Sequence, residues 1–271
     1  MGREEARGET PVPCCAAKPE RGLRTLRRMS AVLITGVSRR AGIAAAVAQR
    51  LRSDGFRVVT AGWSSYDTEN HLGVDEQTDT DLQCDLATLR RLCSSLTPRR
   101  TRWGPLSALV IAHTYDPGGG LFEMTAQLID QHMAINVRGS LVLMRAFAER
   151  ISDPGRSGRV VIFTSGPPQN GAIAYAASKG ALEWITYSAA TELGPRGITV
   201  NAVNPGPNQT GWMTAKIEQE AARRTPLGRA GRPEDAAALV SFLLSDDAAF
   251  INGQVMTSDG GNRIAGGSWP R

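Results

Sequence analysis

Short apolar runs alternate along this chain with longer segments of helical periodicity. The strand-like runs fall at residues 31–35, 56–61, 82–85 (where a third strand ends), 106–112, 159–164, 198–204 and 254–258. The helical periodicity falls between them, at residues 43–53, 125–151, 174–194 and 233–245. Strands that are apolar throughout are buried on both faces, as in a parallel sheet covered by helices on either side. The pattern therefore predicts an α/β fold with one doubly wound parallel sheet, in a single domain.

The first 29 residues do not share this pattern. They mix Pro, Gly, Arg and Glu without an apolar period, and no hydrophobic segment follows their basic residues. We therefore predict a disordered tail at residues 1–29, which is no secretory signal, and a folded domain at residues 30–265. Because Met29 directly precedes the first strand, the tail is either a start-site artefact or a loose extension.

Charge and composition exclude several classes of function. The chain has 271 residues and a net charge of +5, but the first 30 residues carry seven basic and four acidic side chains, so the rest is only +2. We therefore expect no nucleic-acid partner. No apolar run approaches the ~18 residues of a membrane span, so no membrane partner is expected. The four cysteines and three histidines form no metal-ligand motif, which predicts no metal and reduced thiols in a cytoplasmic protein.

Tyr175 and Lys179 form the most informative pair in the sequence. Residues four apart lie on the same face of a helix, so the ammonium is expected near the phenol. A free phenol has a pKa of ~10, and a neighbouring positive charge favours its ionised form. Such a tyrosine can exchange a proton with a carbonyl or alcohol oxygen. The spacing alone is also common on solvated helices.

A glycine-bearing turn follows the first strand. Gly36 and Gly42 stand between that strand and an alanine-rich helix. In this position glycines let a pyrophosphate approach the backbone at the start of a helix, as dinucleotides do in α/β folds. The turn therefore predicts a dinucleotide cofactor.

These features occur together in one order along the chain: Thr35-Gly36, Asn136, Ser165, Tyr175 with Lys179, and Asn204-Pro205-Gly206. In this respect residues 31–262 resemble the short-chain dehydrogenase/reductase family, and most of all its 3-oxoacyl-[acyl-carrier-protein] reductases. The resemblance implies a Rossmann fold and hydride transfer between a nicotinamide cofactor and a carbonyl or alcohol. It implies four catalytic residues, Asn136, Ser165, Tyr175 and Lys179.

The resemblance also implies the cofactor contacts. These are Gly36, Ser38, Arg39, Arg40, Gly42, Ile43, Asp85, Leu86, Ala112, Tyr175, Lys179, Pro205, Gly206 and Thr210. Asp85 would bind the adenine amino group, although it also suits a helix N-cap. Pro205, Gly206 and Thr210 would hold the nicotinamide carboxamide. A substrate lid is expected near residues 207–228.

The chain departs from the family pattern in three places. The turn after the first strand is two residues longer than the usual TGxxxGxG if Gly42-Ile43-Ala44 stands for Gly-Ile-Gly. Residues 111–114 read Ile-Ala-His-Thr where the family has Asn-Asn-Ala-Gly, so His113 and Thr114 are expected to replace the lost amides. The segment from Ser165 to Tyr175 is short and contains two prolines, which makes Thr164 a second candidate for the role of the serine.

The cofactor is expected to be NADP rather than NAD. NAD-binding chains place a carboxylate at the end of the second strand, and here no acid follows that strand until Asp67. Arg39 and Arg40 stand in the first turn, where a guanidinium can bind a 2′-phosphate. NAD is the alternative, with both arginines solvated.

The expected partners are a small carbonyl or acyl-thioester substrate and further copies of this chain. The family implies a homotetramer or homodimer that packs through the helices of Asn136 and Tyr175. An enoyl reductase is a second possible enzyme class, although that group spaces its tyrosine and lysine further apart. The alternative from another class is a regulatory protein that binds NAD(P) without turnover.

Overall fold

A computed structural model describes residues 31–63, 80–83, 104–151, 157–166 and 171–265. It contains one parallel sheet of seven strands in the order β3-β2-β1-β4-β5-β6-β7. The strands are β1 (Ala31–Thr35), β2 (Arg57–Gly62), β3 (Leu82–Gln83), β4 (Leu106–Ile111), β5 (Gly158–Phe163), β6 (Ile198–Asn204) and β7 (Val255–Thr257). The doubly wound parallel sheet predicted from the apolar runs is confirmed, and the predicted strand ends differ by one or two residues.

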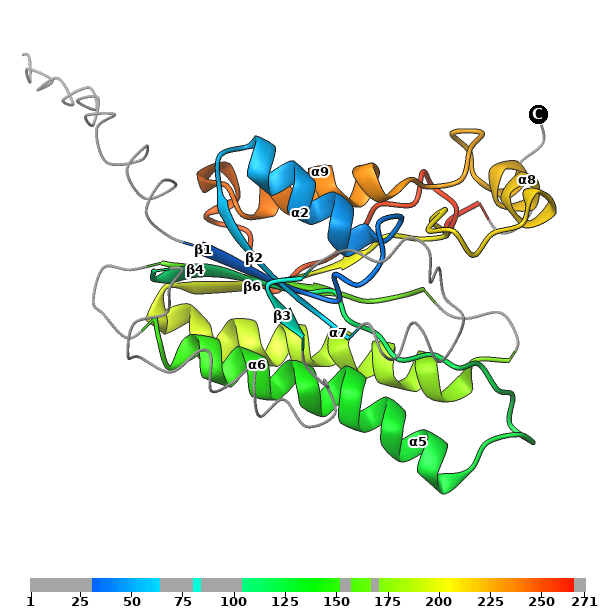
Figure 1. Ribbon diagram of the computed structural model, residues 1–271, viewed down its shortest axis with the longest axis horizontal. Coiled ribbons are helices and arrows are strands. Elements are labelled where there is room, and N and C mark those ends of the chain that lie inside the picture. The colour runs from blue at the N-terminus through cyan, green and yellow to red at the C-terminus, as the bar shows by residue number, and fades with distance from the viewer. Residues whose placement is uncertain (1–30, 64–79, 84–103, 152–156, 167–170, 266–271) are drawn as a thin grey trace, which may run out of the picture.

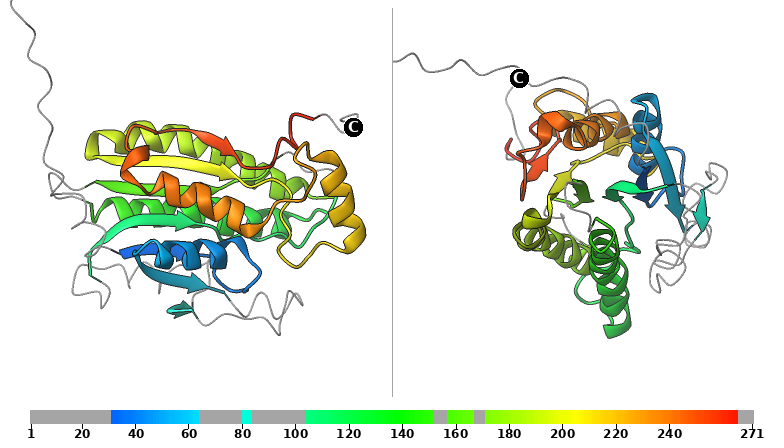
Figure 2. Two further views of the ribbon diagram at one scale, coloured as in Figure 1. Left: turned by 90° about the horizontal axis from the view of Figure 1, so that it is seen from above. Right: turned by 90° about the vertical axis from the view of Figure 1, so that its left-hand side faces the viewer.

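Helices cover both faces of the sheet (Figures 1 and 2). On one face lie α2 (Ile43–Ser53) and α9 (Pro233–Leu243), and on the other lie α6 (Gly139–Ala148) and α7 (Ile173–Leu193). Each face has its own hydrophobic core. Val47 and Val240 belong to the first core, and Phe147 and Leu182 to the second. Burying apolar side chains on both faces is what makes the central strands apolar throughout.

The strand order reverses at β1. This strand pairs with β2 on one side and with β4 on the other, so that Thr35 lies beside both Ala61 and Ile111. In open parallel sheets, ligands bind where the strand order reverses, beyond the carboxyl ends of the strands. The turn that begins at Gly36 starts at this point.

Two helical segments differ from the expectation. The helix predicted at residues 125–151 is divided into α5 (Ala126–His132), a π-helical turn η2 (Met133–Arg138) and α6. The expected lid contains a helix of its own, α8 (Ala215–Arg224), at the edge of the sheet where the strands end (Figure 1). Two short 3₁₀ turns, η3 (Gly194–Arg196) and η4 (Asp246–Ala248), complete the described helices. π-helical turns often occur at functional sites, and η2 contains Asn136.

Candidate active site

The predicted site residues gather at the carboxyl ends of the central strands. The Gly36 turn follows β1, residues 112–116 follow β4, Ser165 follows β5 and Pro205 follows β6. Because all these strands are parallel, their ends lie on one edge of the sheet. Residues that are up to 170 positions apart in the chain, from 36 to 206, are therefore brought to the same edge. Asp85 and Leu86 lie outside the described residues.

The turn after β1 packs closely against the backbone that follows β4. Gly36 has φ of +82°, and a Cβ there would lie 2.6 Å from the backbone nitrogen of His113. Gly42 is the N-cap of α2 and supplies no side-chain hydrogen bond, and the first turn of α2 has no acidic residue. The amides at this helix end are thus open to an anion, which fits a dinucleotide pyrophosphate.

The same turn is anchored to the end of β2. Val37 donates its amide to the carbonyl of Ala61 at 3.1 Å. The buried Ser38 hydroxyl accepts a hydrogen bond from the amide of Trp63 at 3.0 Å. Ser38 therefore holds the turn in place, a role the sequence did not suggest. Arg39 is half-buried and Arg40 is exposed on this turn.

Lys179 is buried beneath Tyr175. Its ammonium donates to the carbonyl of Phe163, the last residue of β5, at 3.1 Å. The Nζ atom lies 5.8 Å from the centre of the Tyr175 ring. Burial lowers the pKa of Lys179 to about 8, while the charge of Asp116 acts in the opposite direction. A lysine with this pKa carries its charge at neutral pH and can release a proton with little cost.

The pKa of Tyr175 shifts against the direction expected from its spacing to Lys179. Burial of the phenol raises this pKa above its usual value, and the Asp116 charge raises it further. Hydrogen bonds with the side chains of Ser165 and Thr114 act to lower it. The expectation of a lowered pKa was wrong for the protein alone, because burial of the phenol outweighs its hydrogen bonds with Ser165 and Thr114.

Asn136 ties the segment after β4 to the first turn of α7. Its Oδ1 accepts from the Tyr115 amide at 2.7 Å, and its Nδ2 donates to the Tyr115 carbonyl at 3.0 Å and to the Ser178 hydroxyl at 2.9 Å. Ser178 in turn donates to the carbonyl of Tyr175 at 2.7 Å. The fully buried amide of Asn136 therefore fixes the position of the Tyr175 turn.

His113 takes over the bracing role left by the missing asparagines, as expected. Its Nδ1 lies 2.8 Å from the hydroxyl of Thr35, and its Nε2 lies 3.1 Å from the carbonyl of Ile135. Burial lowers its pKa to about 4, and the charge of Lys179 adds to the effect. Thr114, the other expected replacement, is exposed and hydrogen-bonds Tyr175 instead. Ala112 donates its amide to Thr35 at 3.3 Å.

The loop after β6 contains Pro205, Gly206 and Thr210. Gly206 has φ of +64° and packs against Asp259, and its amide donates to the Asn204 side chain at 3.0 Å. Thr210 is half-buried. Two buried oxygens at this edge of the sheet, Asn208 Oδ1 and Thr164 Oγ1, find no hydrogen-bond partner among the described residues. Unpaired buried polar atoms are costly, so a bound polar group such as a carboxamide fits here.

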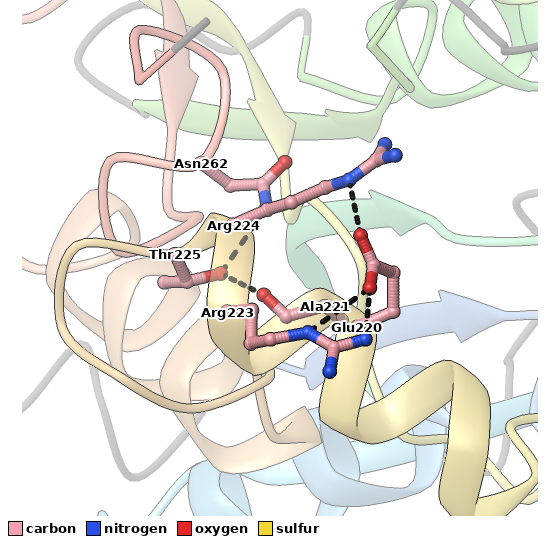
Figure 3. Close-up of polar contacts among 6 residues, drawn as sticks. All are labelled: Glu220, Ala221, Arg223, Arg224, Thr225 and Asn262. Carbon is pink, nitrogen blue, oxygen red and sulfur yellow. Dashed lines mark hydrogen bonds and ion pairs between the residues drawn. The ribbon is translucent and has the colours of Figure 1, made fainter. Parts of the chain in front are cut away.

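Helix α8, in the segment expected to be a lid, is attached to the C-terminal segment (Figure 3). Asn262 donates to the hydroxyl of Thr225 at 3.2 Å, and this hydroxyl donates to the carbonyl of Ala221 at 2.7 Å. On the same helix, the Glu220 carboxylate pairs with both Arg223 and Arg224. Beside α8, Trp212 donates its indole N–H to the Asn208 carbonyl at 3.0 Å.

Two other kinds of site are not found in the described part of the chain. It holds no group of three or more His, Cys, Asp or Glu side chains that could bind a metal ion. None of its helices has the length and apolar character needed to cross a bilayer.

Sequence reasoning missed three contributors to this site. The Thr35 hydroxyl, the Ser178 hydroxyl and the Asp116 carboxylate all act on residues that were predicted. Ser178 offered one signal, since it lies three residues after Tyr175 on the same helix face. Asp116 offered none beyond its place in an Asp-Pro-Gly turn.

Comparison with known proteins identifies the family of this chain. The family model described as enoyl-(acyl carrier protein) reductase matches residues 36–263. An uncharacterized oxidoreductase, YjdA of Bacillus subtilis, is 35% identical over 238 residues, which cover 84% of this chain and 95% of YjdA. The 3-oxoacyl-[acyl-carrier-protein] reductase MabA of Mycobacterium tuberculosis is 31% identical over 240 residues, or 85% of this chain and 91% of MabA. A short-chain dehydrogenase from Burkholderia cenocepacia, solved with NADP, superimposes with a TM-score of 0.73 at 31% identity and covers 87% of this chain and 99% of that one.

Proposed function

Because the chain belongs to the short-chain dehydrogenase/reductase family, we propose that it is an NADPH-dependent reductase of a carbonyl substrate with Tyr175 as general acid. The observation that carries this proposal is the fixed arrangement around Tyr175. Lys179 lies buried beside its ring, Ser165 hydrogen-bonds its side chain, and Asn136 holds its helical turn.

Each residue has a role in the proposed reaction. When bound, a nicotinamide cofactor would supply the hydride that reduces the carbonyl carbon. The phenol of Tyr175 gives its proton to the carbonyl oxygen, and the Ser165 hydroxyl donates a hydrogen bond to the same oxygen. The raised pKa of Tyr175 keeps the phenol protonated at neutral pH, as an acid requires. Lys179, whose pKa is about 8, can return a proton to the tyrosinate.

The proposed cofactor is NADPH, although NADH fits the same cradle. The Gly36 turn and the open start of α2 suit the pyrophosphate of either coenzyme. Arg39 and Arg40 lie on this turn and supply positive charge for a 2′-phosphate. The Burkholderia neighbour solved with NADP is in agreement with this preference.

The proposed substrate class is a 3-oxoacyl thioester or a related ketone. The relative MabA is named as a 3-oxoacyl-[acyl-carrier-protein] reductase and matches most of this chain. Two exposed apolar side chains, Phe122 and Trp212, also lie on the segments that follow β4 and β6. An apolar acyl chain would find partners there.

We further propose that the protein is a homo-oligomer that packs through α6 and α7. Leu141 and Val142 on α6 are exposed, as are Trp184 and Tyr187 on α7, where the two rings make an edge contact at 5.8 Å. A second copy would cover these side chains. Gel filtration of Trp184→Glu beside the parent protein tests this, since an unchanged elution volume would contradict it.

The function is tested by NADPH oxidation with a panel of ketones and 3-oxoacyl thioesters. Tyr175→Phe is expected to lose at least ~10²-fold in kcat and to keep NADPH binding. Tyr187→Phe, which keeps the aromatic ring on the outer face of the same helix, is the matched control and should retain activity. Turnover that survives Tyr175→Phe would refute the mechanism. NADPH binding without turnover on the whole panel would favour the alternative, a non-catalytic regulator.

A further inference from the structure

Asp116 lies in a segment that is held against the catalytic helix at both ends. The preceding residue, Tyr115, is bound through its amide and its carbonyl by the Asn136 side chain, at 2.7 and 3.0 Å. Asn136 is also bonded to Ser178, which bonds to the carbonyl of Tyr175. The backbone that enters Asp116 is therefore fixed relative to Tyr175.

The chain that leaves Asp116 is fixed as well. The Asp116 carboxylate accepts a hydrogen bond from the Gly118 amide at 3.1 Å, which sets the direction of its side chain. The next glycine, Gly119, pairs as an isolated parallel bridge with Ala172, immediately before α7. Asp116 thus lies in a short turn whose two ends are attached to the segments around Tyr175.

This geometry places Asp116 in a turn that is attached on both sides to the surroundings of Tyr175. The charge of Asp116 raises the pKa of Tyr175 and the pKa of Lys179. The other titratable groups packed around them are His113 and Tyr115 on the segment after β4, and His132 on α5, whose ring contacts Tyr115. His113 is neutral at ordinary pH because its pKa is about 4. Among the described residues, Asp116 is therefore the acid whose charge acts on both members of the pair.

We propose that Asp116 is a positioning residue of the reaction centre, whose carboxylate stabilises the neutral phenol of Tyr175 and the ammonium of Lys179. The inference rests on the proposed function, because it assigns Asp116 a part in the same proton transfer. A negative charge disfavours a second anion beside it and favours a cation. Asp116 accordingly extends the pH range in which Tyr175 remains an acid, and so favours reduction over oxidation at alkaline pH.

Asp116→Asn tests this with little change of shape. The asparagine Oδ1 can still accept from the Gly118 amide, so the turn is retained while the negative charge is removed. In the pH dependence of kcat/KM for carbonyl reduction with saturating NADPH, the alkaline limb should move to lower pH by about half a unit to one unit. Raising the salt concentration should move the limb of the parent protein in the same direction, because Asp116 is exposed and screened.

Glu123→Gln is the matched control. Glu123 is an exposed acid in the same loop and accepts from the Gly120 amide at 2.5 Å, but it does not act on Tyr175 or Lys179. The alkaline limb of kcat/KM should lie at the same pH in this variant as in the parent protein. An alkaline limb that stays in place in Asp116→Asn, or that moves equally in both variants, would overturn the proposal.

A second measurement separates this proposal from the proposed function. Ultraviolet titration reports tyrosinate formation without any turnover, and subtracting the curve of Tyr175→Phe isolates Tyr175 from the other three tyrosines. The Tyr175 curve should shift to lower pH in Asp116→Asn. If the curve shifts while no carbonyl substrate is reduced, the reductase proposal fails and the electrostatic role of Asp116 stands. If turnover occurs and neither the limb nor the curve shifts, the role of Asp116 fails alone.

Discussion

His113 Nδ1 and Thr35 Oγ1 lie 2.8 Å apart, and this contact joins β1, the strand before the Gly36 turn, to the segment after β4. On its other side, the imidazole reaches the carbonyl of Ile135 at 3.1 Å. A carbonyl only accepts hydrogen bonds, so Nε2 carries the proton and Nδ1 accepts from the threonine hydroxyl. The neutral imidazole hydrogen-bonds with both partners, and it holds the Gly36 turn at a fixed distance from η2.

This arrangement predicts that acid destabilises the protein through His113. The pKa is about 4 in the folded state against 6.5 for a free histidine, so between these values the unfolded state binds more protons. The stabilisation of the fold is complete above pH ~6.5 and declines as the pH falls. From pH 7.5 to pH 5, His113 should lower the free energy of unfolding by about 2 kcal/mol.

Urea unfolding of the parent protein and of His113→Asn at both pH values checks this prediction. The asparagine cannot titrate, so the pH-dependent loss should be smaller in the variant by about 2 kcal/mol. Carboxylates that titrate in the same range contribute equally to both proteins and cancel in the difference. Equal losses in the two proteins would mean that His113 is not the group responsible.

Asn136 should affect catalysis as well as stability. Asn136→Ala removes the hydrogen bonds of its side chain with the amide and carbonyl of Tyr115 and with the hydroxyl of Ser178, which should cost about 2–4 kcal/mol of unfolding free energy. Because the Tyr175 turn is then free to shift, kcat/KM should also fall by about 10- to 100-fold. Steady-state kinetics and urea unfolding measure the two effects.

Asn252→Ala provides the comparison for Asn136. Asn252 also bridges backbone groups, since its side chain accepts from Val200 at 2.8 Å and donates to Ala190 at 3.0 Å. Neither partner belongs to the candidate site. This variant should lose stability and retain kcat/KM per folded molecule. A parallel loss of activity in both variants would show that stability alone explains the effect of Asn136.

The coenzyme preference depends on the turn after β1. Loss of a charge-assisted hydrogen bond to a 2′-phosphate should weaken NADPH binding by roughly 10- to 100-fold in Arg39→Ala or Arg40→Ala, and should leave NADH binding unchanged. Fluorescence titration with both coenzymes measures this. Arg50→Ala is the control, because Arg50 pairs with Asp54 at the other end of α2. NADPH affinity unchanged in both turn variants would contradict the proposed NADP preference.

The sequence predicts the architecture well because burial on both faces makes every central strand apolar throughout. It also predicts the strand ends to which the site residues attach. The π-helical turn at Asn136 was out of reach, since one extra residue in a single turn hardly alters an apolar period. The helix α8 was missed in a segment expected only as a lid, although Thr214 caps it by accepting from the Ile217 amide.

The electrostatics of the site depend on contacts that spacing does not contain. The raised pKa of Tyr175 follows from burial and from Asp116, a residue on another segment. The hydrogen bonds of Asn136 require η2, α7 and the segment after β4 to pack together before its partners, Tyr115 and Ser178, come within reach. Sequence patterns locate such residues on elements, while their hydrogen-bond partners are determined by tertiary packing.

Gly36 is required both for its backbone conformation and for the space around it, and these two requirements can be separated. Gly36 and Gly55 have similar left-handed φ values of +82° and +88°. A Cβ at Gly55 would meet nothing within 4 Å, whereas a Cβ at Gly36 would lie 2.6 Å from the backbone nitrogen of His113. Gly55→Ala should therefore cost only the conformational strain of about 1–2 kcal/mol, and it should leave NADPH binding intact.

Gly36→Ala should lose more stability than Gly55→Ala, because the backbone of residues 112–113 must move to admit the methyl group. That movement shifts the Gly36 turn relative to the end of β4, so NADPH affinity should fall as well. Urea unfolding and coenzyme titration of the two variants measure both effects. Equal losses of stability together with unchanged NADPH affinity would show that only the φ angle matters, and that the close approach of this turn to His113 does not shape the cofactor site.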